Sequence, residues 1–175
     1  MIELSPWPRI LLIVFCLIAA LWDLKSRRIP NWLTLSGLAG GVALNAALYG
    51  MAGIKTAGSG LGVAAIIALP LYMLRGLGGG DVKMMAAAGA IVGAKNFLLI
   101  FIVNAVLGGA VALAMILWKG RLRRTLSNVA AILREMAHLR APHQGREELD
   151  IGNAEALTLP RAPVFAAAVF LLLLV

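Results

Sequence analysis

The sequence predicts an all-α polytopic membrane protein, and three observations lead to that class. Of the 175 residues, 61% are hydrophobic and 14% are charged, whereas soluble domains carry about 25% charged residues. The apolar residues gather in six runs that charged residues, prolines or glycine clusters separate. The basic residues concentrate in alternate connections between those runs. We therefore expect a single membrane-embedded domain over residues 1–175.

Six apolar runs define the expected transmembrane helices. A helix that crosses the hydrocarbon layer needs about 20 mainly apolar residues, and the fourth run is short. The expected spans cover residues 7–22, 32–49, 57–74, 82–94, 96–118 and 163–175. The first run is not expected to be a cleaved signal peptide, because no basic residue precedes it and Leu-Trp-Asp stands where a small-residue cleavage site should be.

The distribution of charge supports six crossings and fixes their orientation. With six spans, only Arg9, Lys55 and Lys95 fall on one side of the membrane, and all other basic residues fall on the opposite side. The positive-inside rule assigns that richer side to the cytoplasm. Both termini are therefore expected outside.

Residues 119–162 form the only long polar segment and are expected to be a cytoplasmic loop. Its apolar residues recur at helical spacing, at Leu126, Val129, Ile132, Leu133, Met136 and Leu139. Basic residues precede them, so the pattern indicates an amphipathic helix on the anionic lipids of the inner leaflet. A solvated helix packed on the protein's own cytoplasmic face fits the same pattern.

No metal, cofactor or nucleic acid is expected. Cys16 is the only cysteine, and His138 and His143 have no third ligand at a suitable spacing. The net charge of +8 is spread through the connections and does not form a polar basic domain.

Two aspartates are the main candidates for chemistry. Asp23 closes the first span and Asp81 opens the fourth, so both are expected at similar depth on the cytoplasmic side, whereas Asp150 lies in the polar loop. Ionisable residues at such positions in membrane proteins are functional candidates. Two carboxylates at one locus resist simultaneous ionisation, so one holds a proton while the other accepts one from water. That is the chemistry of aspartic peptidases.

Structural interpretations of both acids remain open at this point. Asp23 has basic neighbours at Lys25, Arg27 and Arg28 and would pair with them at the interface. Asp81 would cap the fourth helix, where the helix dipole favours an acid.

The neighbours of each acid are distinctive. Three glycines, residues 78–80, precede Asp81, and glycine lets the backbone approach a substrate closely or adopt a positive φ. After Asp23 comes Ile29-Pro30-Asn31, where Pro30 is expected to begin the second helix and Asn31 to hydrogen-bond at its wet end.

Together these segments resemble the type IV prepilin leader peptidases. Residues 23–34 are similar to the first conserved block of that family, an Asp six residues before Ile-Pro-Asn. Residues 78–83 are similar to its second block, Gly-x-Gly-Asp continuing into Val-Lys. The resemblance covers roughly residues 7–118.

The resemblance implies a membrane aspartic endopeptidase of the bacterial inner membrane. It would remove the leader from prepilin and pseudopilin precursors at the cytoplasmic membrane boundary, with Asp23 and Asp81 as the catalytic acids. The residues that would support the catalytic loop are Gly78, Gly80, Lys83, Ile29, Pro30 and Asn31. Lys83 fits equally well as an orientation anchor.

One departure from the family pattern concerns methylation. Longer members carry a cytoplasmic loop with paired cysteines that binds zinc and accompanies N-methylation, whereas this chain begins directly at its first span and has only Cys16. It is similar to the short form associated with tight-adherence (Flp-type) pili. Peptidase activity without methyltransferase activity is therefore expected.

Two other functions were weighed. A small proton-coupled transporter would need polar groups near the bilayer midplane, but only isolated ones occur, such as Asn45, Ser59 and Asn104, and these are expected to form interhelical hydrogen bonds. A structural subunit of a pilus or secretion complex would act through the polar loop and leave both acids incidental.

Overall fold

The computed structural model describes residues 5–26, 29–74, 77–118 and 161–174, and nearly all of them are helical. The helices are α1 (Pro6–Ser26), α2 (Asn31–Met73), α3 (Gly79–Trp118) and α5 (Arg161–Leu174). The prediction of an all-α fold is confirmed for these residues, and α1, α2 and α3 are each long and apolar enough to cross a membrane. The amphipathic helix expected within 119–162, including His138 and His143, lies outside the described residues.

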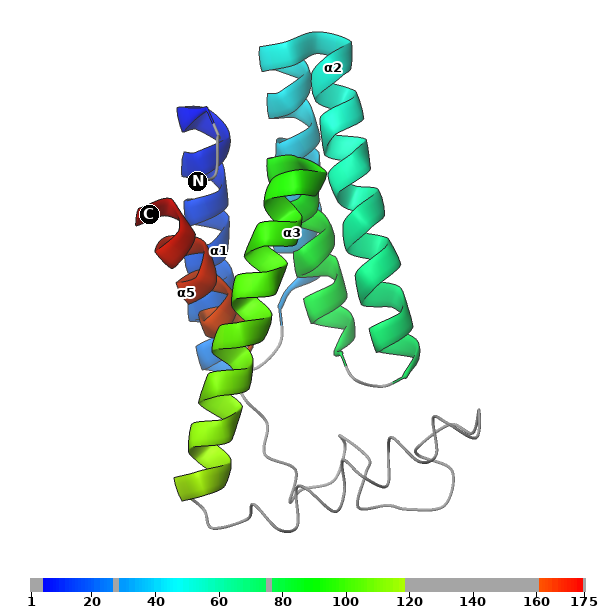
Figure 1. Cartoon of the computed structure of the whole chain (residues 1–175). Helices are drawn as coiled ribbons and strands as arrows, with labels where there is room; N and C mark the ends of the chain where they lie inside the picture. The colour runs from blue at the N-terminus through cyan, green and yellow to red at the C-terminus, as the bar shows by residue number, and fades with distance from the viewer. Residues whose placement is uncertain (1–4, 27–28, 75–76, 119–160, 175) are drawn as a thin grey trace.

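Helix α2 reverses its direction at Gly50, so that its two halves lie side by side (Figure 1). A straight helix of its 43 residues would be about 65 Å long, roughly twice the thickness of the hydrocarbon layer. The reversal occurs at φ 58° and ψ −135°, a backbone conformation that glycine adopts without a steric penalty.

Helix α3 reverses in the same way at Gly93, where φ is 77° and ψ is 172°. A side chain there would also collide with Thr56 of α2, because a Cβ would lie 2.6 Å from the Thr56 Cγ2 atom. The conformation and the space thus both require glycine.

The helical segments between these reversals follow the expected runs. The clearest difference concerns the third run, which was expected to begin at residue 57, whereas the second half of α2 begins directly after Gly50. The turn is completed at a single glycine, so the polar residues Lys55 and Thr56 belong to the helix.

The halves of α2 and α3 pack through glycines. Gly60 of α2 and Gly89 of α3 face each other so closely that a Cβ on either would overlap the backbone of the other helix. Small residues that let helix backbones approach closely are typical of helix pairs in membranes.

A buried amide joins the same two helices. Asn45, only 3% exposed, donates from Nδ2 to the carbonyls of Ala90 at 3.2 Å and Ile91 at 3.0 Å, and to Gly41 of its own helix at 2.9 Å. The carbonyls of Ala90 and Ile91 precede the break at Gly93, where helical acceptors lose their usual partners. The predicted interhelical role of Asn45 is confirmed. The prediction for Ser59 is wrong, because its hydroxyl donates to Thr56 of its own helix.

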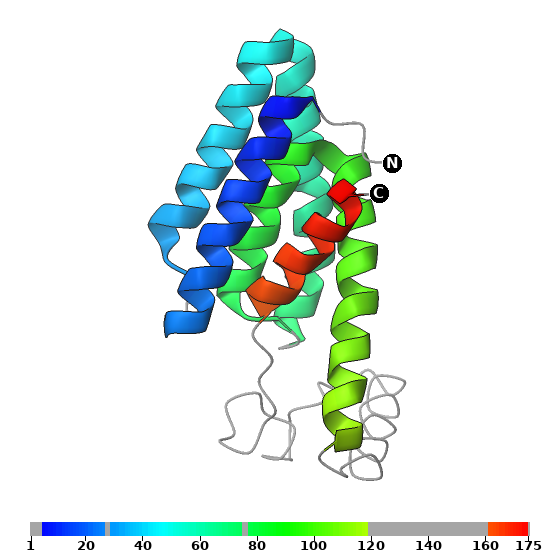
Figure 2. The ribbon, with the colours of Figure 1, turned by 90° about the vertical axis from the view of Figure 1, so that its left-hand side faces the viewer.

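Helices α1 and α5 cover the remaining face of the bundle. The ring of Phe15 on α1 fills the space that Gly37 leaves on α2. Figure 2 shows α5 lying between α1 and the second half of α3, where Phe165, Ala168 and Val169 are buried. The amino end of α1 and the carboxyl end of α5 point toward the same end of the bundle.

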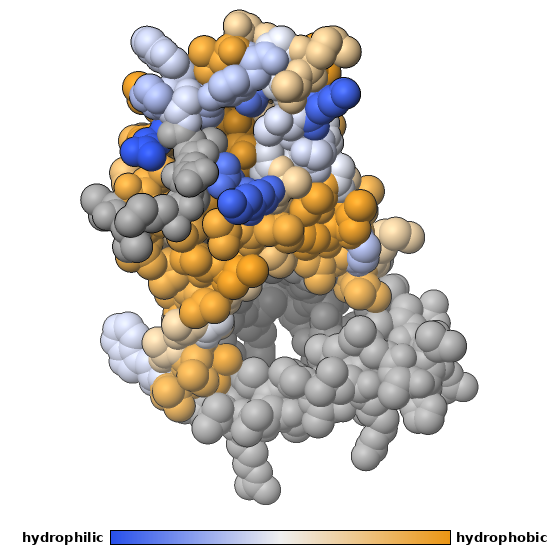
Figure 3. All heavy atoms as spheres, turned by 45° about the horizontal axis from the view of Figure 1, so that its top comes forward, coloured by the Kyte–Doolittle hydropathy of each residue, from blue (hydrophilic) through white to orange (hydrophobic). Residues whose placement is uncertain are grey.

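The outer surface of the bundle is rich in apolar side chains. Large residues such as Ile66, Val106 and Leu35 are more than half exposed. In Figure 3 hydrophobic atoms form the broad flank, and hydrophilic atoms gather at the end where α2 and α3 reverse. An apolar flank with polar ends is the surface expected of a protein that faces lipid.

Candidate active site

Both candidate acids lie at the end of the bundle opposite the two reversals. Asp23 stands in the last turn of α1 and Asp81 in the first turn of α3. Helix α5 begins at the same end (Figure 1). The topology therefore brings three helix termini to one end of the molecule.

The Asp23 carboxylate binds the beginning of α5. Its Oδ2 atom accepts a hydrogen bond from the Ala162 backbone N–H at 3.2 Å. The first N–H groups of a helix have no partner within the helix, and an acid is favoured there by hydrogen bonding and by the helix dipole. Asp23 is half-buried by this contact. The described part of the chain shows no ion pair between Asp23 and Lys25, and Arg27 and Arg28 lie outside the described residues.

The Asp81 carboxylate caps the helix on which it stands. Its Oδ2 atom accepts a hydrogen bond from the Gly78 backbone N–H at 3.3 Å, while the Asp81 N–H donates to the Gly78 carbonyl at 3.1 Å. This reciprocal pair resembles a capping box. The predicted capping role is confirmed, and these two hydrogen bonds hold the carboxylate at the amino end of α3.

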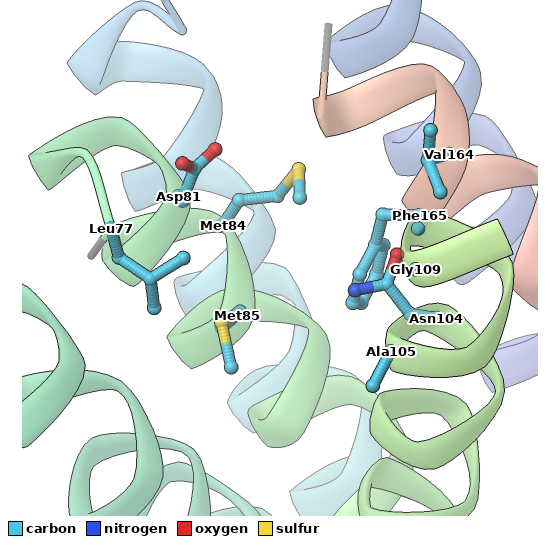
Figure 4. Close-up of a pocket in the computed structure, with 10 residues that line it drawn as sticks. Leu77, Asp81, Met84, Met85, Asn104, Ala105, Gly109, Val164 and Phe165 are labelled. Atoms are coloured by element: carbon cyan, nitrogen blue, oxygen red, sulfur yellow. The ribbon is translucent and has the colours of Figure 1, made fainter. Parts of the chain in front are cut away.

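The same Asp81 side chain lines a cavity of about 240 Å³. Figure 4 shows Leu77, Asp81, Met84 and Met85 on one side, and residues of α5 and of the second half of α3 on the other. The second group consists of Asn104, Ala105, Gly108, Gly109, Val164 and Phe165. Most of the lining is apolar, and Asp81 supplies the ionisable group.

Helix α5 contacts the surroundings of both acids within its first turn. Ala162 binds Asp23, and Val164 and Phe165 line the cavity beside Asp81. Residues 162 and 165 are separated by about 4.5 Å along a helix axis. The first turn of α5 therefore binds one acid directly and lines the cavity of the other, 58 positions away in sequence.

The two sequence segments that carry these acids also contact each other. The Lys83 ammonium donates to Asn31 Oδ1 at 2.8 Å. A Cβ on Gly80 would lie 3.6 Å from the Ile29 Cβ, which is ordinary van der Waals contact. The beginning of α2 and the beginning of α3 are thus joined directly.

Pro30 and Asn31 begin α2 in a slightly different way from the one predicted. Pro30 is the residue before the helix, with an extended backbone at φ −69° and ψ 143°, and its carbonyl accepts from the Leu33 N–H. The prediction that Pro30 is the first helical residue is wrong by one position. The expected polar role of Asn31 is confirmed, but its partner is the Lys83 side chain.

The glycines before Asp81 do not adopt a positive φ. Among the described residues, glycines with positive φ are Gly50 and Gly93, at the helix reversals. Of the two uses that the sequence suggested for Gly78 and Gly80, the one that depends on unusual backbone angles is therefore wrong. The other use, close approach of the backbone to a substrate, stays a prediction, and a Cβ on Gly80 would make only ordinary contact with Ile29.

Sequence reasoning missed the contribution of α5, and its prediction for Asn104 is wrong, because Asn104 forms no interhelical hydrogen bond among the described residues. Ala162, Val164 and Phe165 look like ordinary apolar residues, and no local pattern links them to acids more than 80 positions away. For Asn104 a signal existed, since a carboxamide inside an apolar span is costly unless it has a partner.

The described residues include no group of three or more His, Cys, Asp or Glu side chains that could hold a metal ion. A pair of carboxyl groups can activate water and polarise a carbonyl by general acid–base catalysis, and of the two acids here Asp81 lines the cavity.

A comparison with models of protein families matches this chain over residues 10–113 with the type IV leader peptidase family. The matched range includes Asp23, Asp81 and the segments around them. Comparisons with curated proteins and with solved structures gave no match.

Proposed function

Because the chain belongs to the type IV leader peptidase family, we propose that Asp23 and Asp81 are its two catalytic carboxylates. The family consists of aspartic peptidases of the inner membrane that act on prepilins, so the chain is a prepilin peptidase. The proposal adds the identity of the catalytic residues, the class of precursor and the arrangement in the membrane.

One observation carries the assignment of the acids, namely that both stand at helix termini at the end of the bundle where α5 begins. Ala162 of α5 binds Asp23, and Val164 and Phe165 of α5 line the cavity wall opposite Asp81. A pair of acids that acts on one peptide bond must stand at the same end of the bundle. Asp150, the third aspartate of the chain, lies outside the described residues.

The proposed reaction is hydrolysis by a water molecule. One carboxylate takes a proton from the water as its oxygen attacks the scissile carbonyl carbon, and the other carboxyl group, protonated, donates a hydrogen bond to the carbonyl oxygen. The tetrahedral intermediate then breaks its C–N bond, and the leaving nitrogen receives a proton. We assign these two roles to the pair and not to either residue.

The proposed membrane arrangement has six spans, formed by α1, the two halves of α2, the two halves of α3, and α5. The reversals at Gly50 and Gly93 support it, because they divide α2 and α3 into antiparallel halves, of which the first half of α3 is shorter than the hydrocarbon layer is thick. Lys25 and Lys83 then lie at the end that carries the acids, and Lys55 and Lys95 follow the reversals at the other end. With the first end facing the cytoplasm, both termini are outside.

This orientation places the acids where the substrate needs them. A precursor with an apolar helix in the bilayer has its leader at the cytoplasmic boundary, and Asp23 and Asp81 stand at helix ends on that side. The polar segment that precedes α5 is proposed to rest on anionic inner-leaflet lipids, an assignment that the sequence pattern supports.

The proposed substrates are Flp-type prepilins and pseudopilins, and the proposed product carries no added methyl group. The class of pilin is supported by resemblance to the short form of the family. The absence of methylation is supported by the cysteine content, because Cys16 is the one cysteine of the 175 residues and is buried in α1.

Co-expression with a candidate Flp-type prepilin tests this proposal. The mass of the pilin's amino terminus is expected to show loss of the leader and no methyl group. An uncleaved precursor beside a correctly inserted enzyme would contradict the class of substrate, and a methylated product would contradict the second part.

A further inference from the structure

We propose that Asn104 binds the peptide backbone of the precursor beside the bond that is cut. This inference rests on the proposed function and adds a substrate-binding residue to it. Asn104 stands on the second half of α3, outside both segments that resemble the conserved blocks of the family.

Asn104 and Asp81 lie on opposite walls of the cavity. In Figure 4 the Asn104 carboxamide extends from one wall, and the Asp81 carboxylate extends from the wall formed by the first half of α3. The space between them is therefore bounded by an ionisable group on one side and a neutral hydrogen-bonding group on the other.

The carboxamide of Asn104 differs from the two other asparagines in the apolar spans. Asn45 donates to backbone carbonyls of two helices, and Asn96 donates to the Val92 carbonyl at 3.1 Å. Asn104 makes no hydrogen bond within the described part of the chain. A polar group in an apolar span that stabilises no helix contact is costly, and such groups in membrane proteins point to function.

The chemistry of a carboxamide fits an unwound peptide. For water to reach a scissile carbonyl, the precursor must leave its helical conformation there, and its N–H and C=O groups lose their helical partners. Unpaired backbone groups near a bilayer must find other partners. A carboxamide offers both an acceptor oxygen and an N–H₂ donor, so it can bind either group or both.

The cavity has room for such a segment. Ala105 and Gly109 lie on the same face of α3 as Asn104, and a Cβ on Gly109 would meet nothing within 4 Å. An apolar cavity of about 150 Å³ accommodates benzene, so 240 Å³ accommodates one large apolar side chain next to the bound backbone. Met84 and Met85 are flexible enough to adapt the wall to different side chains.

The test compares two identical substitutions on one helix. Asn104→Leu removes the donor and the acceptor and nearly preserves volume, and Asn96→Leu does the same at an asparagine whose amide already bonds to Val92 across the Gly93 reversal. We expect Asn104→Leu to lower kcat/KM for leader removal about tenfold, equivalent to about 1.4 kcal/mol, mainly through KM. Asn96→Leu is expected to keep kcat/KM within about twofold of wild type.

A binding measurement separates this role from folding and from catalysis. In the cleavage-deficient Asp23→Asn background, whose side-chain oxygen can still accept from Ala162, precursor affinity is expected to fall about tenfold when Asn104→Leu is added. If Asn104→Leu leaves both the precursor affinity and kcat/KM unchanged, this inference is overturned. The proposed function stays intact in that case as long as the wild-type protein cleaves the precursor. A loss of affinity matched by Asn96→Leu would overturn it as well, because the effect would then be structural. Failure of the wild-type protein to cleave any prepilin would overturn the proposed function and this inference together.

Discussion

The Lys83 ammonium donates a 2.8 Å hydrogen bond to the Asn31 carboxamide oxygen, joining two residues 52 positions apart. Asn31 belongs to the first of the two segments that resemble the conserved blocks of the family, and Lys83 belongs to the second. Together with the contact between Gly80 and Ile29, this bond connects the segment that follows Asp23 with the segment that contains Asp81. The two blocks thus form one structural unit.

Loss of this bond is expected to slow cleavage without abolishing it. Both side chains are exposed, and exposed pairs contribute about 1 kcal/mol or less. Lys83→Met and Asn31→Leu are each expected to lower kcat/KM about threefold. The double variant is expected to be no worse than the poorer single variant, because both substitutions remove the same bond. Additive losses in purified enzyme would show that the two residues act independently.

The contact of α2 with α3 at Gly60 is expected to tolerate no side chain. Gly60→Ala would push a methyl group into the Gly89 backbone, and overpacking of this kind costs about 1–3 kcal/mol or more. At Gly58, two residues earlier, a Cβ would meet nothing within 4 Å. Gly58→Ala is therefore expected to be neutral or to stabilise by up to about 1 kcal/mol. The free energy of unfolding in detergent measures both, and equal values for the two variants would contradict this packing.

Asn45 is expected to matter for stability more than for chemistry. Asn45→Leu would leave the carbonyls of Ala90 and Ile91 without their partner, which costs about 1–3 kcal/mol in the free energy of unfolding. Ser59→Ala serves as the control, since its hydroxyl is exposed and bonds within its own helix. If both variants unfold like wild type, the interhelical bond contributes nothing.

The six-span arrangement predicts that Met51 and Trp118 lie on opposite sides of the membrane. Met51 follows the Gly50 reversal and is 69% exposed, and Trp118 ends α3 and is 92% exposed. In spheroplasts, a membrane-impermeant maleimide is expected to label the Met51→Cys variant and to leave the Trp118→Cys variant unlabelled until the membrane is opened. Cys16, 1% exposed, provides the unlabelled background. Labelling of both variants in intact spheroplasts would exclude the six-span arrangement.

Much of the fold could be predicted from the sequence, because long apolar runs indicate membrane helices. The segments of α1, α2, α3 and α5 follow from such runs and from the charges between them. Which glycines reverse a helix could not be predicted, because Gly50 and Gly93 stand among many glycines that only relieve crowding. Their special role depends on a positive φ, which becomes necessary only when the neighbouring helices are in place.

The candidate site was predicted in part. Asp23 and Asp81 were identifiable because acids are rare in this chain and have distinctive neighbours. The contact between Asp23 and Ala162 spans 139 positions and depends on how α5 packs, for which an apolar helix carries no local pattern. The difference between Asn45 and Asn104 likewise arises from which helix faces each carboxamide, and sequence alone treats the two as equivalent.

The central claim is that Asp23 and Asp81 act as a catalytic pair, and the most direct test is the rate of leader removal by three purified variants. Asp23→Asn and Asp81→Asn keep side-chain size and an oxygen that accepts from Ala162 or Gly78, so both are expected to insert normally. Each is expected to lower kcat by about 100-fold or more, while Asp150→Asn cleaves at the wild-type rate. If either of the first two variants cleaves the precursor at a rate close to wild type, the two acids are not a catalytic pair.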